Sequence, residues 1–242
     1  MTPAPIRLLI HGASGRMGRA LLRLASEDAR LQCVAAVSGQ GKPIAEAMAV
    51  PVFAAKDTAQ LPDFDVLVDF SLPVAFDAAL DLAKQCRCAF VSGTTGLSAA
   101  QRAALEAAAR SIPVLWASNF SLGIAVLTEL VRRASAALPQ WQRNIIESHH
   151  IHKKDAPSGT ALTLGAAVEA GGGPAPDYSS IRAGDIVGEH TVQFTGLGER
   201  LELTHRATNR DIFARGALEC AIRLHGCAAG RYEVADMVMR GA

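Results

Sequence analysis

The chain has 242 residues, of which 50% are hydrophobic and 19% charged, enough to build the core of one large or two small globular domains. Its 24 basic and 23 acidic side chains leave a net charge of +1, which excludes a global positive field for nucleic acid or a membrane surface. The five cysteines are scattered, and no apolar run has the length of a secretory signal or a membrane span. We therefore expect a cytoplasmic protein with reduced thiols, in which any positive site is local.

The first predicted elements are a strand, a glycine turn and a helix. Residues 6–10 form a short apolar run, Gly12, Gly15 and Gly18 follow it, and residues 20–26 continue with helical spacing. This order is typical of a dinucleotide-binding unit, because glycines let the backbone approach a pyrophosphate and free N–H groups at a helix start bind its charge. The spacing departs from G-x-G-x-x-G, so a tight turn that binds nothing is the alternative.

The end of the second predicted strand, residues 33–37, bears on the choice of coenzyme. Dinucleotide-binding units often carry an acid there that binds the ribose hydroxyls, and this chain has none. Ser38, Lys42 or Arg16 would tolerate a 2′-phosphate. The sequence leaves both NADH and NADPH open as the coenzyme, and it predicts a Michaelis constant for NADPH no worse than that for NADH.

Strands and helices keep alternating up to about residue 120. The expected strands and helices lie at residues 66–70, 74–85, 89–92, 98–110 and 113–118. Small or polar residues follow each strand, as in the ligand-binding loops at the carboxyl edge of a parallel sheet. For residues 93–95 and 119–121, ordinary turn chemistry is the alternative.

After residue 123 the pattern changes to that of a second, α+β domain. The expected helices and strands lie at residues 124–137, 144–147, 159–170, 180–182, 190–195, 201–204 and 212–224. These elements alternate too little to extend the first sheet. We therefore predict an α/β chain with a Rossmann-like parallel-sheet domain and a second domain with an open, mostly antiparallel sheet.

Three histidines and two lysines stand within six residues, at His149, His150, His152, Lys153 and Lys154. If the preceding strand ends near His149, the following residues curl into a loop where their side chains can converge. Lysine supplies a fixed positive charge, and an imidazole exchanges a proton near neutral pH. The cluster therefore favours a site that binds a small, multiply anionic substrate and gives it a proton.

A helix start follows this cluster directly. Ser158 is the candidate N-cap, and the backbone N–H groups of Gly159 and Thr160 then face whatever lies before the helix. Such N–H groups suit a carboxylate. We expect the anionic substrate to be held partly by this helix start.

Other interpretations of these residues stay open. His149, His150 and His152 could bind zinc, although their spacing is unlike H-x-x-x-H, or they could line a solvated basic edge. No serine lies in a G-x-S-x-G context, which disfavours serine-triad chemistry. Cys86 and Cys88 are spaced as C-x-C, which favours incidental thiols over a metal or redox pair.

Together these motifs resemble the 4-hydroxy-tetrahydrodipicolinate reductase (dihydrodipicolinate reductase) family of bacterial and plant lysine synthesis. The matching motifs lie at residues 12–18, 68–71, 93–96, 119–121, 147–153, 155–160, 182–190 and 198–200. They keep the family's order along nearly the whole chain, and the histidine–lysine block that ends in Ser158, Gly159 and Thr160 is the most specific of them. The family reduces 4-hydroxy-tetrahydrodipicolinate to tetrahydrodipicolinate with NADPH or NADH, in diaminopimelate and lysine biosynthesis.

The resemblance also implies which residues form the sites. His149 matches the family's proton donor or acceptor and Lys153 its second proton donor, while His150, Ser158, Gly159 and Thr160 would bind the dicarboxylate. The implied coenzyme-binding residues are Gly12, Ala13, Ser14, Gly15, Arg16, Met17, Gly93, Thr94, Thr95, Ser118, Asn119, Phe120 and Ser121. No metal is implied.

The implied domains are a dinucleotide-binding domain of residues 1–120 and 216–242 and a substrate-binding and oligomerisation domain of residues 121–215. The family is usually a homotetramer joined through the open sheet. The chain departs from some members at Val37 and Ser38, where they have an acid followed by arginine, and this leaves the coenzyme preference open.

Two other functions are alternatives to this reductase activity. One is another two-domain oxidoreductase, such as a homoserine or amino-acid dehydrogenase, which would lack the histidine–lysine block. The other is a non-catalytic NAD(P)-sensing protein, which would have no proton-donor cluster.

Overall fold

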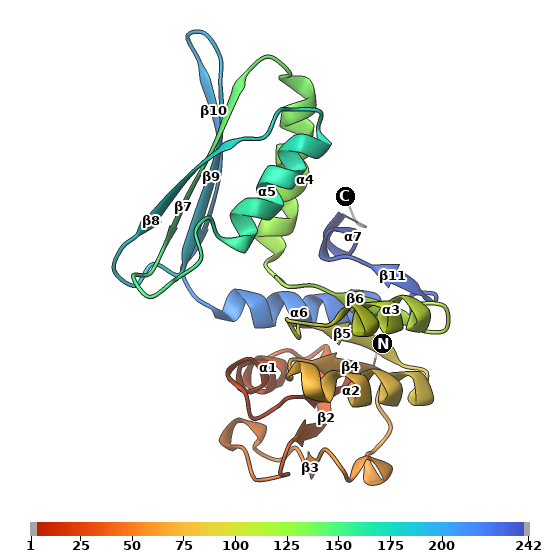
Figure 1. The fold of residues 1–242 in the computed structure, drawn as a ribbon. Helices are drawn as coiled ribbons and strands as arrows, with labels where there is room; N and C mark the ends of the chain where they lie inside the picture. The colour runs from red at the N-terminus through yellow and green to blue at the C-terminus, as the bar shows by residue number, and fades with distance from the viewer. Residues whose placement is uncertain (1–3, 240–242) are drawn as a thin grey trace. The chain divides into compact units, whose positions relative to one another are not determined.

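The computed structural model describes residues 4–239, and these fall into two compact units. Unit 1 comprises residues 4–120 and 213–239, and unit 2 comprises residues 121–212 (Figure 1). Each unit has its own sheet and is described by itself.

Unit 1 is built on a parallel sheet of seven strands. The strands are β1 (Ile6–His11), β2 (Leu31–Ser38), β3 (Val52–Ala54), β4 (Val66–Asp69), β5 (Ala89–Ser92), β6 (Pro113–Trp116) and β11 (Gly230–Tyr232), in the spatial order β11-β6-β5-β4-β1-β2-β3. The order therefore reverses between β1 and β4, and at such a switch point an open parallel sheet offers a crevice for ligands. The Rossmann-like domain predicted from the sequence is confirmed.

The helices of unit 1 are α1 (Arg16–Ser26), α2 (Pro73–Cys86), α3 (Ala99–Ala108), α6 (Asp211–Leu224) and α7 (Val234–Met239). The first two residues of α6 belong to unit 2. Short 3-10 turns lie at Ala45–Ala47 and Thr58–Gln60. Helix α1 begins at Arg16, inside the glycine stretch and four residues before the predicted helical pattern. Helix α3 begins after Ser98, whose side chain forms a capping box with Gln101.

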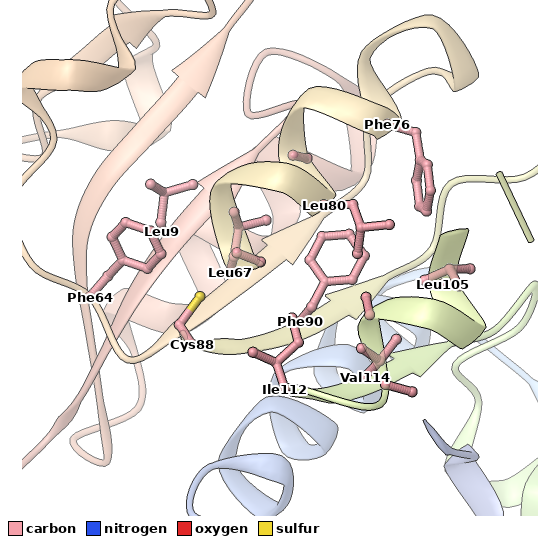
Figure 2. Packing of buried hydrophobic residues seen from close by; sticks show 14 of the residues in the cluster. Leu9, Phe64, Leu67, Phe76, Leu80, Cys88, Phe90, Leu105, Ile112 and Val114 are labelled. Carbon is pink, nitrogen blue, oxygen red and sulfur yellow. The ribbon is translucent and has the colours of Figure 1, made fainter. Parts of the chain in front are cut away.

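Burial of apolar strands on both sides explains the continuous hydrophobic runs of this sheet. Figure 2 shows Leu9, Leu67 and Phe90 from neighbouring strands packed with Phe76 and Leu80 of α2. All five side chains are at most 2% exposed. Each contributes about 1.5–3 kcal/mol of burial free energy, so the core fixes the strand ends that carry the polar loops.

Unit 2 pairs a four-stranded sheet with two helices. Its elements are α4 (Leu122–Ala137), β7 (Gln142–His149), α5 (Gly159–Ala170), β8 (Asp177–Arg182), β9 (Gly188–Thr195) and β10 (Arg200–Ala207). The strand order is β10-β9-β7-β8, with antiparallel pairs β10–β9 and β9–β7 and a parallel pair β7–β8. The predicted open, mostly antiparallel sheet is confirmed.

Both helices of unit 2 lie on the same face of its sheet (Figure 1). Burial alternates strictly along β7 and β9, and Ile145, Val192 and Phe194 pack against Val131 of α4 and Leu164 of α5. At one end of this covered face the buried residues become polar, namely Glu147 and His149 on β7 and His190 on β9. The candidate site of unit 2 lies there.

Candidate functional site

The glycine turn of unit 1 leaves the start of α1 without a side-chain cap. Gly15 is the N-cap residue, in an extended conformation, and it makes no side-chain cap hydrogen bond. Gly12 has φ +77°, and a Cβ there would lie 2.5 Å from the carbonyl oxygen of Phe70, so only glycine fits. Uncapped N–H groups at a helix start, beside a switch point, suit an anionic pyrophosphate.

A buried carboxylate ties the strand ends around this turn together. Asp69 is fully buried at the end of β4, and its oxygens bond to His11 Nδ1 at 2.8 Å, Ser92 Oγ at 2.8 Å and Thr94 Oγ1 at 2.7 Å. Burial alone would raise the pKa of the Asp69 carboxyl, but hydrogen bonds from His11, Ser71 and Thr94 outweigh it and hold this pKa below its ordinary value. The charged carboxylate thus fixes β1, β4 and β5 relative to one another.

The structure places the predicted coenzyme residues at the carboxyl edge of the parallel sheet or directly after it, except Ser121, which is the N-cap of α4 in unit 2. Their exposures differ. Ser14, Gly15, Arg16, Thr95 and Ser118 are exposed, Gly12, Met17, Gly93 and Asn119 are half-buried, and Ala13, Ser38, Thr94, Phe120 and Ser121 are buried. The first two groups therefore present more accessible surface to a ligand than the third.

Three of the buried residues already have structural partners. Ser38 Oγ accepts from the N–H of Gly41 at 3.1 Å, which shapes the turn after β2. The Thr94 hydroxyl donates to Asp69, and the Phe120 ring lies 5.4 Å from that of Phe70. A coenzyme contact of these three residues stays a prediction.

In unit 2, His149 is the last residue of β7 and pairs with a buried carboxylate on the same strand. Its Nδ1 makes a short hydrogen bond with Oε2 of Glu147, whose side chain is fully buried. Burial lowers the pKa of the His149 imidazole, and the bond to Glu147 acts against this effect. His149 is 8% exposed, so its ring is held in one place but still reaches the surface.

Arg182, on the neighbouring strand β8, completes this arrangement. Its Nη1 lies 2.9 Å from Oε2 and its Nη2 2.7 Å from Oε1 of Glu147. Burial alone would raise the pKa of the Glu147 carboxyl, but hydrogen bonds from Arg182, Ser180 and His149 outweigh it and bring the pKa to about 2. Glu147 is therefore ionised at neutral pH.

The loop after β7 carries Lys153. Its Nζ lies 2.8 Å from both carboxylate oxygens of Asp155, and Arg182 Nη2 donates to the carbonyl of Asp155 at 2.6 Å. The sequence-based expectation that the strand ends near His149 and the next residues curl into a loop is confirmed. His150 lies in this loop, with its ring centroid 6.2 Å from that of His152.

The start of α5 meets this region through Ser158. Its hydroxyl caps the helix by accepting from Ala161 N, and it lies 3.0 Å from Nε2 of His190. Burial brings the pKa of His190 to about 4, and its ring packs edge-on against His149 with centroids 5.1 Å apart. Since the Ser158 hydroxyl is committed to these contacts, its predicted contact with substrate stays a prediction. A Cβ on Gly159 would meet no atom within 4 Å, so the helix start is open there.

Several residues of these networks had no role assigned from the sequence, among them Asp69, Glu147, Arg182 and His190. They stand inside the motifs quoted above, but their pairing depends on strand register. Within residues 4–239, no group of three or more His, Cys, Asp and Glu side chains is placed to hold a metal ion.

Unit 1 has a parallel sheet with a glycine turn, and unit 2 holds a paired imidazole and an ammonium group. Together these features define a two-domain dinucleotide-dependent oxidoreductase. Residues 6–120 match the family model described as dihydrodipicolinate reductase, N-terminus, and residues 123–238 match the one described as dihydrodipicolinate reductase, C-terminus. The chain belongs to the dihydrodipicolinate reductase family, as the sequence motifs indicated.

Relatives named 4-hydroxy-tetrahydrodipicolinate reductase match over the full length. The protein of Xanthomonas axonopodis pv. citri is 62% identical over 239 residues, covering 99% of this chain and 100% of that one. The protein of Stenotrophomonas maltophilia is 63% identical over 239 residues, covering 98% and 100%.

Solved structures support the fold. Dipicolinate-bound dihydrodipicolinate reductase from Paenisporosarcina sp. TG-14 matches with a TM-score of 0.81 at 22% identity, covering 97% of this chain and 99% of that one. Diaminopimelate dehydrogenase of C. glutamicum matches with a TM-score of 0.65 at 14% identity, covering 97% and 94%. Among the described residues, no helix combines the length and apolarity needed to cross a bilayer.

Proposed function

We propose that the chain reduces 4-hydroxy-tetrahydrodipicolinate to tetrahydrodipicolinate with NADPH or NADH, as a step of diaminopimelate and lysine biosynthesis. The observation that carries this proposal is the arrangement at the end of β7, where a buried carboxylate orients His149 beside the loop of Lys153. Such an arrangement suits an anionic substrate that must also receive a proton. Family membership supplies the identity of the substrate.

The glycine turn of unit 1 fits a dinucleotide. The uncapped N–H groups after Gly15 would bind the pyrophosphate, and the exposed side chains of Ser14, Arg16 and Thr95 would contact the rest of the coenzyme. When bound, the coenzyme supplies a hydride to C4 of the substrate's conjugated imine. With no acid at the end of β2, we propose that both NADPH and NADH are accepted.

The dicarboxylate would be held in unit 2. The backbone N–H groups of Gly159 and Thr160 at the start of α5 suit one carboxylate, and His150 and Lys153 supply further donors and positive charge. Asp155 neutralises the ammonium of Lys153 in the free chain. A bound carboxylate would therefore compete with Asp155 for this ammonium.

The residues of unit 2 perform the proton chemistry. Lys153 and the N–H groups at the start of α5 stabilise the negative charge that develops across the C=C–C=N system. His149 gives a proton to the carbon next to C4. Burial lowers the pKa of His149 in the free chain, and the two negative charges of the substrate act in the opposite direction by favouring the imidazolium. Loss of water from the 4-hydroxy substrate precedes the reduction.

We also propose a cytoplasmic homotetramer in which residues 1–120 and 216–242 bind the dinucleotide and residues 121–215 bind substrate and join the subunits. We assign the contact between subunits to the face of the unit 2 sheet opposite α4 and α5 (Figure 1). It carries polar cross-strand pairs, such as Thr191 with Thr204 at 3.0 Å and Gln193 with Glu202 at 2.7 Å. Light scattering on the purified chain tests the tetramer, and a monomer at all concentrations would contradict it.

The proposed reaction is tested by following NADPH and NADH oxidation with the freshly made product of the preceding synthase. We expect oxidation that depends on that product with either coenzyme. Pyridine-2,6-dicarboxylate, a flat dianion, should raise the melting temperature in the presence of NADPH. Coenzyme binding without any oxidation would contradict the proposal and favour a sensor protein.

A further inference from the structure

Glu147 is buried in the middle of three strands. It lies on β7 opposite Ser180 of β8 and His190 of β9, and its side chain has no exposed surface. A buried carboxylate is costly unless every oxygen has a hydrogen-bond donor. Here Arg182 donates to both oxygens, and Nδ1 of His149 bonds to one of them.

The charge of Glu147 decides which nitrogen of His149 carries hydrogen. An ionised carboxylate only accepts hydrogen bonds, so the Nδ1 that faces it must be protonated. In the neutral ring Nε2 then has no hydrogen, and in the imidazolium Nε2 carries the proton that can leave. The orientation of the ring and its tautomer are therefore set by the same contact.

One neighbour of the Nε2 atom is a glycine. Gly188, the first residue of β9, lies beside it, and a Cβ placed there would be 3.1 Å from Nε2 and 3.4 Å from Cδ2. Any larger residue at this position would crowd the ring. Glycine at this position therefore keeps the Nε2 side of the His149 ring free of a neighbouring Cβ.

Arg182 connects this imidazole to the loop of the second proton-bearing group. One nitrogen, Nη2, donates both to Glu147 Oε1 at 2.7 Å and to the carbonyl of Asp155 at 2.6 Å. Asp155 is the residue that pairs with Lys153. The guanidinium of Arg182 therefore fixes the carboxylate of Glu147, which orients His149. It also fixes the backbone of Asp155, which pairs with Lys153.

We propose that Glu147 is a positioning residue for the reduction: its carboxylate, fixed by Arg182, holds His149 with hydrogen on Nδ1 and presents Nε2 as the proton-exchanging atom. In the reaction the Nε2–H bond of the imidazolium breaks as the new C–H bond forms next to C4. The ring is left neutral, with its hydrogen on Nδ1. This inference rests on the proposed role of His149 as proton donor.

The first test is the variant Glu147→Gln, which keeps the size of the side chain and removes its charge. We expect kcat to fall by about 10- to 100-fold, with Michaelis constants for substrate and coenzyme within about twofold of wild type. The charged and titratable groups around His149 are Glu147 on β7, Arg182 on β8, His190 on β9 and Lys153 in the loop. The variant removes the Glu147 carboxylate, which is the negative charge in this group, so the pKa of His149 should fall. The limb of the kcat–pH profile that reports this pKa should therefore move to lower pH.

Glu169→Gln is the matched control. It makes the same chemical change on an exposed residue in the last turn of α5, and we expect wild-type kinetics and the wild-type pH profile. A pure loss of folding stability in Glu147→Gln would lower the active fraction without moving the pH limb. The position of the His149 limb in the kcat–pH profile therefore distinguishes a positioning role of Glu147 from a loss of folding stability.

A second measurement needs no activity. Nitrogen-15 NMR of the free wild-type chain, with the His149 signals assigned by their loss in His149→Gln, reports which ring nitrogen carries hydrogen. We expect the neutral ring to carry it on Nδ1. A neutral His149 with hydrogen on Nε2 would overturn the inference.

The two proposals fail in different ways. If His149→Ala retains turnover, the role of His149 is wrong and the proposed function loses its proton donor. If His149→Ala is inactive while Glu147→Gln keeps wild-type kcat and pH profile, His149 keeps its role and the positioning by Glu147 is wrong.

Discussion

The carboxylate of Asp69 at the end of β4 lies 2.8 Å from Nδ1 of His11 at the end of β1, across the point where the strand order of the parallel sheet reverses. Both side chains are buried. The turn that begins at Gly12 follows His11 directly, so this pair fixes the base of the proposed pyrophosphate-binding turn. Removing the charge should therefore affect both the stability of unit 1 and its binding of coenzyme.

Asp69→Asn should lower the free energy of unfolding by about 2–3 kcal/mol. The variant replaces one of the two acceptor oxygens with an NH₂ group, which cannot accept the hydrogen bonds that His11, Ser92 and Thr94 make with the carboxylate. Urea denaturation of the ligand-free chain measures this loss. Isothermal titration should also show weaker NADPH binding, because the same contacts order the turn.

Asp81→Asn is the control for this change. Its side chain in α2 is 61% exposed and pairs with Lys84, so its free energy of unfolding should stay within about 0.5 kcal/mol of wild type. Equal stability of the two variants would show that the buried network around Asp69 contributes nothing specific.

Stability in acid should depend on Glu147. Its pKa of about 2 in the folded chain lies below the ordinary value of 4.5, so ionised Glu147 stabilises the fold fully above about pH 4.5. This contribution is lost as the pH falls from about 4.5 through 2. Melting temperatures across this window should fall more steeply for wild type than for Glu147→Gln, and parallel curves would contradict the assignment.

Gly188→Ala should impair catalysis through the His149 ring. The added methyl group would lie 3.1 Å from Nε2, closer than ordinary contacts, and would occupy the space of a reacting atom. We expect kcat to fall by about 10-fold or more, with an unchanged Kd for NADPH because the change lies in unit 2. Wild-type kcat would mean that the substrate approaches His149 from another side.

Lys153→Ala should lower kcat/KM severely, on the order of 100-fold, because it removes the positive charge that stabilises the developing anion. Steady-state kinetics with NADPH in excess measures the loss. Lys154→Ala, one residue further along the same loop, is the control and should keep kcat/KM within about twofold. Equal losses in both variants would indicate a general effect of positive charge instead of a specific role of Lys153.

Much of the fold could be predicted because its signals are local. The strand Ala89–Ser92 and the helix Gly159–Ala170 lie at the predicted residues, since an apolar run defines the first and Ser158 and Gly171 bound the second. The strands β3 and β11 were not predicted. Each has only three residues and lies at an edge of the sheet, where no continuous apolar run is needed.

The same distinction holds for the site. The histidines and Lys153 could be found because they are near one another in the sequence, and a turn from His150 to Lys153 directly follows the strand. Glu147 and Arg182 are 35 positions apart and Asp69 and His11 are 58 apart, so their pairing follows from strand register and burial. Neither can be read from composition or spacing.

The most direct measurement is the turnover number of His149→Ala with the synthase product and NADPH. We predict a fall on the order of 100-fold or more, with NADPH binding unchanged, because the proton donor is lost while unit 1 stays intact. Turnover close to that of wild type would contradict the central role given to His149.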